Sequence, residues 1–308
     1  MATQAAPSQP PVRQDLAALF TDLEQSFSTT NLGPDRWYLI VLAALVGGTE
    51  PELADQLYIH IINQPTHQSP QSRQALVRRL REALVKLVSI VGVCKPLEAI
   101  LSISKVERPE DRDYTFTRKD WNADAANHER GANWLKKIYA GNTEDTLALF
   151  DAHKDFRWIS EEITYGLYLS DRQVLDDWDT EVVVLSGIMI QNLKLETRWH
   201  IRGALRVGMS KGNVVAVMGC VRRVAEFTEV KLNRIPSVEE VEHEVFIKIT
   251  EDYAFLQLHE RLFPFPDGLL NRLEVIPSNT GGDFRLITKD MSGKNGINLK
   301  HFLTYSFP

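Results

Sequence analysis

Apolar residues recur at helical spacing over most of the chain, from about residue 15 to residue 230. The segment 15–27 carries four apolar side chains on one face, which predicts a short amphipathic helix. The segment 37–45 is almost wholly apolar and predicts a buried helix. Leucines recur on one face of 71–91, and Gly92 is expected to end that helix. The first hundred residues therefore predict a packed group of helices.

A second group of helices is predicted further along the chain. The strongest periodicity lies in the segments 132–140, 143–150, 176–191, 196–207 and 212–227. Ser210 is placed to cap the last of these helices, and Thr49-x-x-Glu52 resembles a capping box for a helix in the first group. The fold class predicted by these patterns is all-α.

Polar segments divide the helical regions. Residues 106–130 hold a proline, several aspartates and little periodicity, so they are predicted to link two helical units. After Asn233 short extended segments alternate with turn-forming residues, which predicts a small irregular or strand-containing appendage. The extended segments are 244–249, 273–276, 284–288 and 301–305. The predicted organisation is a disordered tail (1–13), a first helical unit (14–105), the linker (106–130), a second helical unit (131–232) and the appendage (233–308).

The two units share a weak internal pattern. Thr49-Glu50 precedes the first amphipathic helix of one unit, and Thr143-Glu144 opens the other. A longer helix then begins near Glu82 in the first unit and near Glu181 in the second. Spacing of this kind also arises by chance, so it only permits an internal duplication.

Composition narrows the possible partners. The formal net charge is −6, which argues against nucleic acid because phosphate binding requires a concentrated basic surface. The densest basic stretch runs from Arg78 to Lys86 and is expected to be a solvated helix face. No apolar run is long enough to cross a membrane, and the N-terminus lacks the pattern of a signal peptide. The chain has two cysteines, so we expect a reducing compartment, the cytoplasm.

The segment 179–210 holds the residues best suited to chemistry. Glu196 and His200 stand four residues apart and would share a helix face. Glu181 lies on the preceding predicted helix and could approach the same place if the two helices pack as a hairpin. A carboxylate beside an imidazole orients the ring for proton transfer. The alternative is an ordinary surface pair of glutamate and histidine.

This segment resembles the core motif of the carboxymuconolactone decarboxylase/alkylhydroperoxidase-D superfamily. The similarity lies in the spacing of nineteen residues from Glu181 to His200 and in the turn Gly208-Met-Ser210 that leads into another helix. The run Glu196-Thr-Arg-Trp199-His200 is similar to the Glu-Trp-x-x-His run of the decarboxylases, with the tryptophan displaced. The acidic pair that usually follows the turn is Gly212-Asn213 here. The resemblance spans about residues 35–228, and the two-unit arrangement resembles that of fungal members associated with secondary metabolism.

The resemblance implies a duplicated helical unit and a cofactor-independent lyase or isomerase. It implies a decarboxylase or related enzyme that acts on a small oxygenated acid of the kind found in polyketide metabolism. His200 would be the general acid, Glu196 its orienting partner and Glu181 a second carboxylate for protonation or substrate positioning. Trp199 would line the pocket, or would be a packed core residue. The first unit, with Glu82 but no matching histidine, would be a degenerate copy that completes the fold.

Two other functions stay open at this point. The peroxidase branch of the superfamily uses a Cys-x-x-Cys pair, but Leu193 and Glu196 stand at those positions here. A thiol redox protein therefore lacks its cysteine pair, and Cys94 is expected to be a packed apolar residue. A non-catalytic helical scaffold is the other alternative. The remaining histidines are isolated, so neither a metal nor a cofactor is predicted. The expected partner is a small molecule, and association with a second copy of the chain stays open.

Overall fold

The computed structural model describes residues 10–245, 273–277 and 284–288. Eleven α-helices make up most of the first of these ranges, which confirms the predicted all-α body. The α-helices are α1 (Gln14–Phe27), α2 (Trp37–Gly47), α3 (Ala54–Ile62), α4 (Pro70–Val91), α5 (Cys94–Val106), α6 (Ala125–Tyr139), α7 (Thr143–Ala148), α8 (Lys154–Trp158), α9 (Asp177–Met189), α10 (Lys194–Arg206) and α11 (Lys211–Phe227). Four 3₁₀ turns, η1 to η4, and one π-helix, η5 (Ile159–Leu169), connect or extend them.

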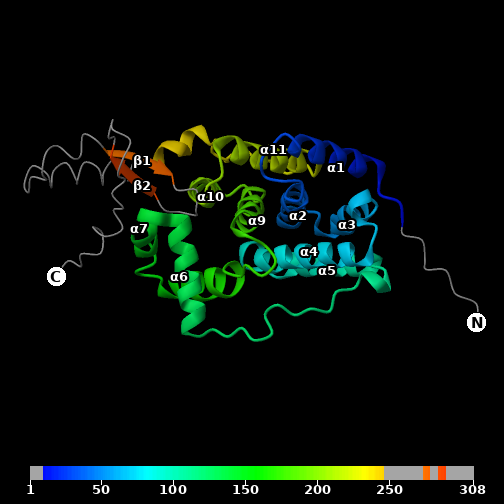
Figure 1. Cartoon of the computed structure of the whole chain (residues 1–308), viewed down its shortest axis with the longest axis horizontal. Helices are drawn as coiled ribbons and strands as arrows, with labels where there is room; N and C mark the ends of the chain where they lie inside the picture. The colour runs from blue at the N-terminus through cyan, green and yellow to red at the C-terminus, as the bar shows by residue number, and fades with distance from the viewer. Residues whose placement is uncertain (1–9, 246–272, 278–283, 289–308) are drawn as a thin grey trace, which may run out of the picture.

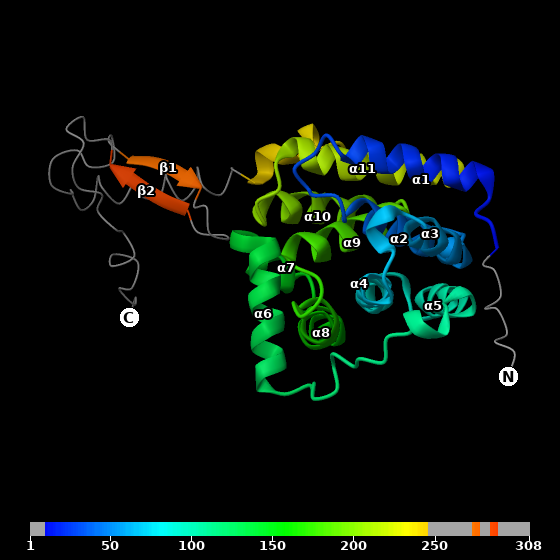
Figure 2. The same ribbon diagram turned by 45° about the vertical axis from the view of Figure 1, so that its right-hand side comes forward.

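The helices lie in layers around two central helices, α2 and α9 (Figure 1). Helices α1 and α11 lie on one side of this pair, α4 and α5 on the other, and α6 stands at one end (Figure 2). Every residue of α2 is buried, as its unbroken apolar sequence requires. The body therefore has one continuous core that includes side chains from both predicted units.

Two glycines allow the central helices to pack closely. A Cβ atom added to Gly47 at the end of α2 would lie 2.9 Å from the carbonyl oxygen of Gly187 on α9. Any larger residue at Gly47 would push the two backbones apart. Lys95 then donates to the carbonyls of Gly47 and Gly48, at 3.0 and 2.7 Å, and so satisfies the end of α2.

Most predicted helices are present, with some corrections at their ends. Gly92 ends α4 with a φ of 84°, and the Ser210 side chain accepts from the Asn213 amide at the start of α11, as predicted. Thr49 does not cap a helix, so the predicted capping box was wrong: the 3₁₀ turn η1 (Pro51–Leu53) intervenes before α3. The sequence pattern also gave no warning of α8 and η5, because α8 has no buried residue and η5 buries few.

The predicted linker is shorter and more firmly held than its composition indicates. Helix α6 begins at Ala125, inside the segment 106–130. The remaining linker is tied to α4, since Arg78 and Arg81 both bind the Asp113 carboxylate. The basic stretch of α4 is therefore a set of internal ion pairs and not the expected solvated face. Lys86 at its end is fully buried.

Packing onto the body continues beyond residue 232. Val238 and Val241 belong to the core, and residues 239–245 are helical, so the predicted extended segment 244–249 begins in a helix and then leaves the described residues. The predicted segments 273–276 and 284–288 correspond to β1 (Leu273–Pro277) and β2 (Phe284–Thr288). These strands pair antiparallel, with Val275 opposite Leu286. The predicted segment 301–305 lies outside the described residues.

Candidate functional site

The structure brings Glu181 and His200 together in the core. Glu181 lies on α9, whose residues from Asp179 to Met189 are all buried, and His200 lies on the neighbouring helix α10. Glu181 Oε1 is 2.8 Å from His200 Nδ1. The carboxylate is completely buried, and about 6% of the histidine side chain is exposed. We call this arrangement the Glu181–His200 pair.

The start of α9 is fixed by its own cap. The Asp176 side chain accepts from the Asp179 amide at 2.7 Å, and the Asp179 carboxylate accepts from the Asp176 amide at 3.3 Å. Arg36 and Arg79 then bind the Asp179 carboxylate from α2 and α4, at 2.9 and 3.1 Å. Because Glu181 follows two residues later, this anchorage sets the position of its carboxylate.

Gly203 makes room for that carboxylate. It lies one turn beyond His200 on α10, and a Cβ atom there would be 2.8 Å from Glu181 Oε1 and 2.8 Å from the Ile138 side chain. Even alanine would displace one of these neighbours. The glycine therefore permits the contact between Glu181 and His200.

Each member of the pair keeps one polar atom that has no hydrogen-bond partner among the described residues. Glu181 Oε2 is buried and has no hydrogen-bond partner in the part of the chain that the structure describes. Burial raises the pKa of Glu181, and the adjacent His200 opposes that rise. Within the same residues His200 Nε2 also has no hydrogen-bond partner, since the ring is bound only through Nδ1. One ring nitrogen is thus held by a carboxylate while the other is left to exchange a proton.

Aromatic side chains enclose the histidine. Tyr139 on α6 packs edge-on against both Trp199 and His200, with ring centroids 6.0 and 6.5 Å apart. Its hydroxyl lies 3.3 Å from the hydroxyl of Tyr165 on η5. Burial raises the pKa of Tyr139 to about 12, so this phenol keeps its proton near neutral pH. Tyr139 and Trp199 thus form an aromatic wall beside the histidine, in which Tyr139 makes the ring contact with His200.

Glu196 does not occupy the place that its spacing predicts. Within residues 10–245 and the two strands it forms no hydrogen bond with His200, and the ring is bound by Glu181 instead. The charge of Glu196 contributes to raising the pKa of Tyr139, after burial and the charge of Glu181. Glu196 also lines a cleft of about 390 Å³ at the start of α10, together with Arg198 and Arg234. This cleft lies one helical turn before His200.

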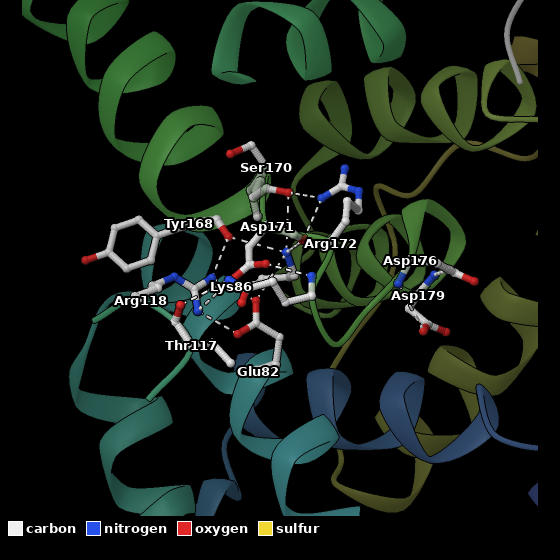
Figure 3. Close-up of polar contacts among 12 residues, drawn as sticks. Glu82, Lys86, Thr117, Arg118, Tyr168, Ser170, Asp171, Arg172, Asp176 and Asp179 are labelled. Carbon is white, nitrogen blue, oxygen red and sulfur yellow. Dashed lines mark hydrogen bonds and ion pairs between the residues drawn. The ribbon is translucent and has the colours of Figure 1, made fainter. Parts of the chain in front are cut away.

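The first helical unit holds its buried glutamate in a different way. Arg118 from the linker binds both oxygens of Glu82 on α4, at 2.6 and 2.7 Å (Figure 3). Lys86 Nζ is 3.4 Å from Glu82 and donates to the carbonyls of Tyr168, Leu169 and Asp171, at 3.4, 3.3 and 2.9 Å. Asp171 lies 3.6 Å from Arg118. We call these residues the Glu82 cluster; sequence reasoning proposed Glu82 but missed its partners.

The cysteines do not form a redox pair. Cys220 is buried and Cys94 is exposed, and both are free thiols. The prediction that Cys94 is packed was therefore wrong: Cys94 is the first residue of α5, and its side chain is exposed. Burial raises the pKa of the Cys220 thiol, which lowers its reactivity.

Neither metal-binding nor membrane-spanning features emerge from the described ranges. No group of three or more His, Cys, Asp or Glu side chains within them could hold a metal ion. No helix in the same ranges has the length and apolar character needed to cross a membrane.

Residues 10–245 thus form an all-α body that encloses a carboxylate–imidazole pair. The chain is similar to Peroxisomal protein 2 of Schizosaccharomyces pombe, with 25% identity over 149 residues. The match covers 48% of this chain and 69% of that protein. No family model matches the chain, and no solved structure matches it. The comparison therefore gives a distant relative and no family.

Proposed function

We propose that this protein is a cofactor-independent acid–base catalyst, a decarboxylase or related lyase or isomerase that acts on a small oxygenated acid. The observation that carries the proposal is the 2.8 Å contact between Glu181 and His200 Nδ1, with Nε2 left unbound by the described residues. A carboxylate on one ring nitrogen fixes the orientation of the imidazole. The resemblance to the carboxymuconolactone decarboxylases, and with it the duplication of the helical unit, belongs to this proposal.

The chemistry follows from the free ring nitrogen. When a carboxylate on the carbon next to a carbonyl group leaves as CO₂, the electrons of the broken carbon–carbon bond are delocalised into that carbonyl and form an enolate. Protonated His200 gives the Nε2 proton to the enolate carbon and becomes neutral, and solvent then restores the proton. Glu181 stabilises the charged ring before the transfer and keeps it aimed afterwards. Glu181 thus takes the orienting role that the spacing had given to Glu196.

The surroundings suit an oxygenated substrate. Trp199 and Tyr139 supply apolar surface beside the ring, and the Tyr139 hydroxyl keeps its proton at neutral pH. The cleft lined by Glu196 opens one turn away on the same helix. In this proposal Glu196 accepts a hydrogen bond from a hydroxyl group of the substrate, because it would repel a carboxylate.

The test begins with the substrate. Metabolites that accumulate in the host without the gene, and disappear when the wild-type gene is restored, identify candidates for assay with purified protein. His200→Gln should lower turnover about 10²–10⁴-fold, since glutamine cannot exchange a proton near neutral pH. Glu181→Gln should lower it less, and Glu196→Gln less again. Circular dichroism of each variant checks that the helices remain.

Other outcomes would point to the rival functions. A requirement for Cys94 together with a dispensable His200 would indicate thiol redox chemistry, which hydroperoxide consumption would measure. Full activity of the His200→Gln and Cys94→Ser variants in restoring the host would indicate a helical scaffold.

We also propose the peroxisome as a second candidate location beside the cytoplasm. The support is the printed name of the distant relative in Schizosaccharomyces pombe. Fluorescent fusions at the N-terminus and, separately, at the C-terminus should colocalise with a peroxisomal marker. A diffuse signal from both fusions would favour the cytoplasm.

A further inference from the structure

A cleft of about 670 Å³ lies apart from the Glu181–His200 pair. Its walls are the linker residues 116–117 and 119–121, Arg130 of α6, and the residues 170–173 that follow η5. Its volume falls in the range of small-molecule sites. Arg130 precedes Tyr139 by nine residues on α6, so about 13 Å of helix separates the cleft from the aromatic wall around His200. The cleft is a separate candidate site.

The charged side chains on the inner wall of this cleft are already paired within the protein. Asp171 and Arg172 line it, and Asp171 belongs to the Glu82 cluster (Figure 3). Arg172 binds the Asp177 carboxylate, and its guanidinium lies 4.1 Å from the centre of the Trp134 ring. Arg118 is bound to Glu82 through both carboxylate oxygens. These arginines therefore have no free charge to offer a ligand.

Arg130 is different. Within the described residues it has no carboxylate partner, and its Nε atom is buried without a hydrogen-bond acceptor. Its guanidinium carbon lies 4.4 Å from the centre of the Trp121 ring, which fixes the orientation of the group. Its terminal guanidinium nitrogens likewise have no acceptor among the described residues, so an oxyanion in the cleft would supply the acceptors that this donor lacks.

The remaining wall defines the rest of a ligand. Lys119 adds a second positive charge, opposed by Asp120. Phe116 lines the cleft with 70% of its surface exposed, so its ring is available to an apolar group in the cleft. The cleft thus combines an oriented cationic group with an uncovered aromatic ring.

We propose that this cleft binds a small organic carboxylate with an apolar body. The carboxylate accepts hydrogen bonds from the Arg130 guanidinium, whose planar fork matches two carboxylate oxygens. The apolar body packs against Phe116. This site does not depend on the proposed function of the Glu181–His200 pair.

Calorimetric titration of the full-length protein with benzoate tests the proposal. Benzoate should bind the wild type, and benzamide, which has the same shape without the charge, should bind at least about ten-fold more weakly. Arg130→Gln should weaken benzoate binding about ten-fold or more, while Arg130→Lys should retain part of the affinity. Phe116→Ala should weaken it by a few-fold. Arg222→Gln, at an exposed helix position of α11, should leave binding unchanged.

The location of binding is read from the indole signal of Trp121, assigned by comparison with Trp121→Phe. This signal should shift on addition of benzoate to the wild type and stay in place in Arg130→Gln. Circular dichroism and melting temperature check the fold of each variant. Absence of benzoate binding by the wild type, or binding unaffected by Arg130→Gln, would overturn the proposal. Inorganic phosphate binding as tightly as benzoate would overturn the role of the apolar wall.

Discussion

Two buried glutamates in this molecule are held by partners of different chemistry. Glu82 is bound by Arg118 through both oxygens and lies near the buried Lys86. Glu181 is bound by one imidazole. An arginine keeps its proton at any physiological pH, whereas a histidine exchanges one near neutrality. The same acidic side chain therefore joins chain segments in one place and can support proton transfer in the other.

The strongest test of this difference is the removal of Arg118. Arg118→Met should lower the free energy of unfolding by about 3–5 kcal/mol, because Glu82 and Asp171 would stay buried without their cationic partner. Urea denaturation measures this loss. Arg112→Met, at an exposed position in the same linker, is the matched control and should cost less than about 0.5 kcal/mol. Equal effects of the two substitutions would show that the Glu82 cluster does not anchor the linker.

The second test uses the pH dependence of Lys86. Burial lowers the pKa of Lys86 to about 8, whereas the unfolded chain keeps this proton up to about pH 10.4. Between these values the unfolded state binds more protons, so this lysine makes the folded state more stable as pH rises. The stability of the wild type relative to Lys86→Met should increase by about 1–2 kcal/mol between pH 8 and pH 9.5. A difference that is constant with pH would contradict this prediction.

The Glu181–His200 pair should show the opposite slope. Burial raises the pKa of Glu181, so the stability that this group contributes is complete below its unfolded pKa and is lost as pH rises through the folded value. Glu181→Gln lacks this titration and should gain stability relative to the wild type above about pH 4.3, on the order of 1 kcal/mol. Denaturant titrations at pH 4, 5, 6 and 7 would follow the trend. A relative loss of stability with rising pH would show that the carboxylate is stabilised in its charged form.

The smallest effect is expected at Cys94. Because the thiol is exposed and has no disulfide partner, Cys94→Ser should change the free energy of unfolding by less than about 0.5 kcal/mol. It should also leave turnover unchanged if the chemistry belongs to His200. If turnover were lost in Cys94→Ser and in no other variant, the activity would depend on the thiol and on neither Glu82 nor Glu181.

Local patterns in the sequence predicted the helices better than they predicted the contacts between them. Helices α2, α4 and α11 follow from apolar runs, Gly92 and Ser210, since each signal acts within a few residues. The helix η5 was missed because it buries few residues, Tyr165, Gly166 and Leu169, so no long apolar pattern marks it. The irregular linker segment gave no sign that Arg118 reaches into the core, because such a contact depends on the tertiary arrangement.

The candidate site shows the same limit. The spacing of four residues predicted that Glu196 lies beside His200. Glu181 was expected there only if the two helices pack as a hairpin. The structure gives the contact to Glu181, across nineteen residues of sequence. One local signal was present: Gly203 lies within a helix, where glycine is unfavourable and so requires a packing reason. A local signal was also present for Glu82: Lys86 follows it by four residues on the same helix, which places the two side chains on one face.

Gly203 has a consequence for the history of this protein. A helix that keeps glycine in its interior gives up about 1 kcal/mol relative to alanine, and that loss is useful only while a neighbouring carboxylate occupies the space. In a descendant that had abandoned the pair, alanine at this position would be free to appear and would stabilise the helix. Related chains with glycine here should therefore also keep the glutamate and the histidine, whereas chains with a larger residue should have lost one of them.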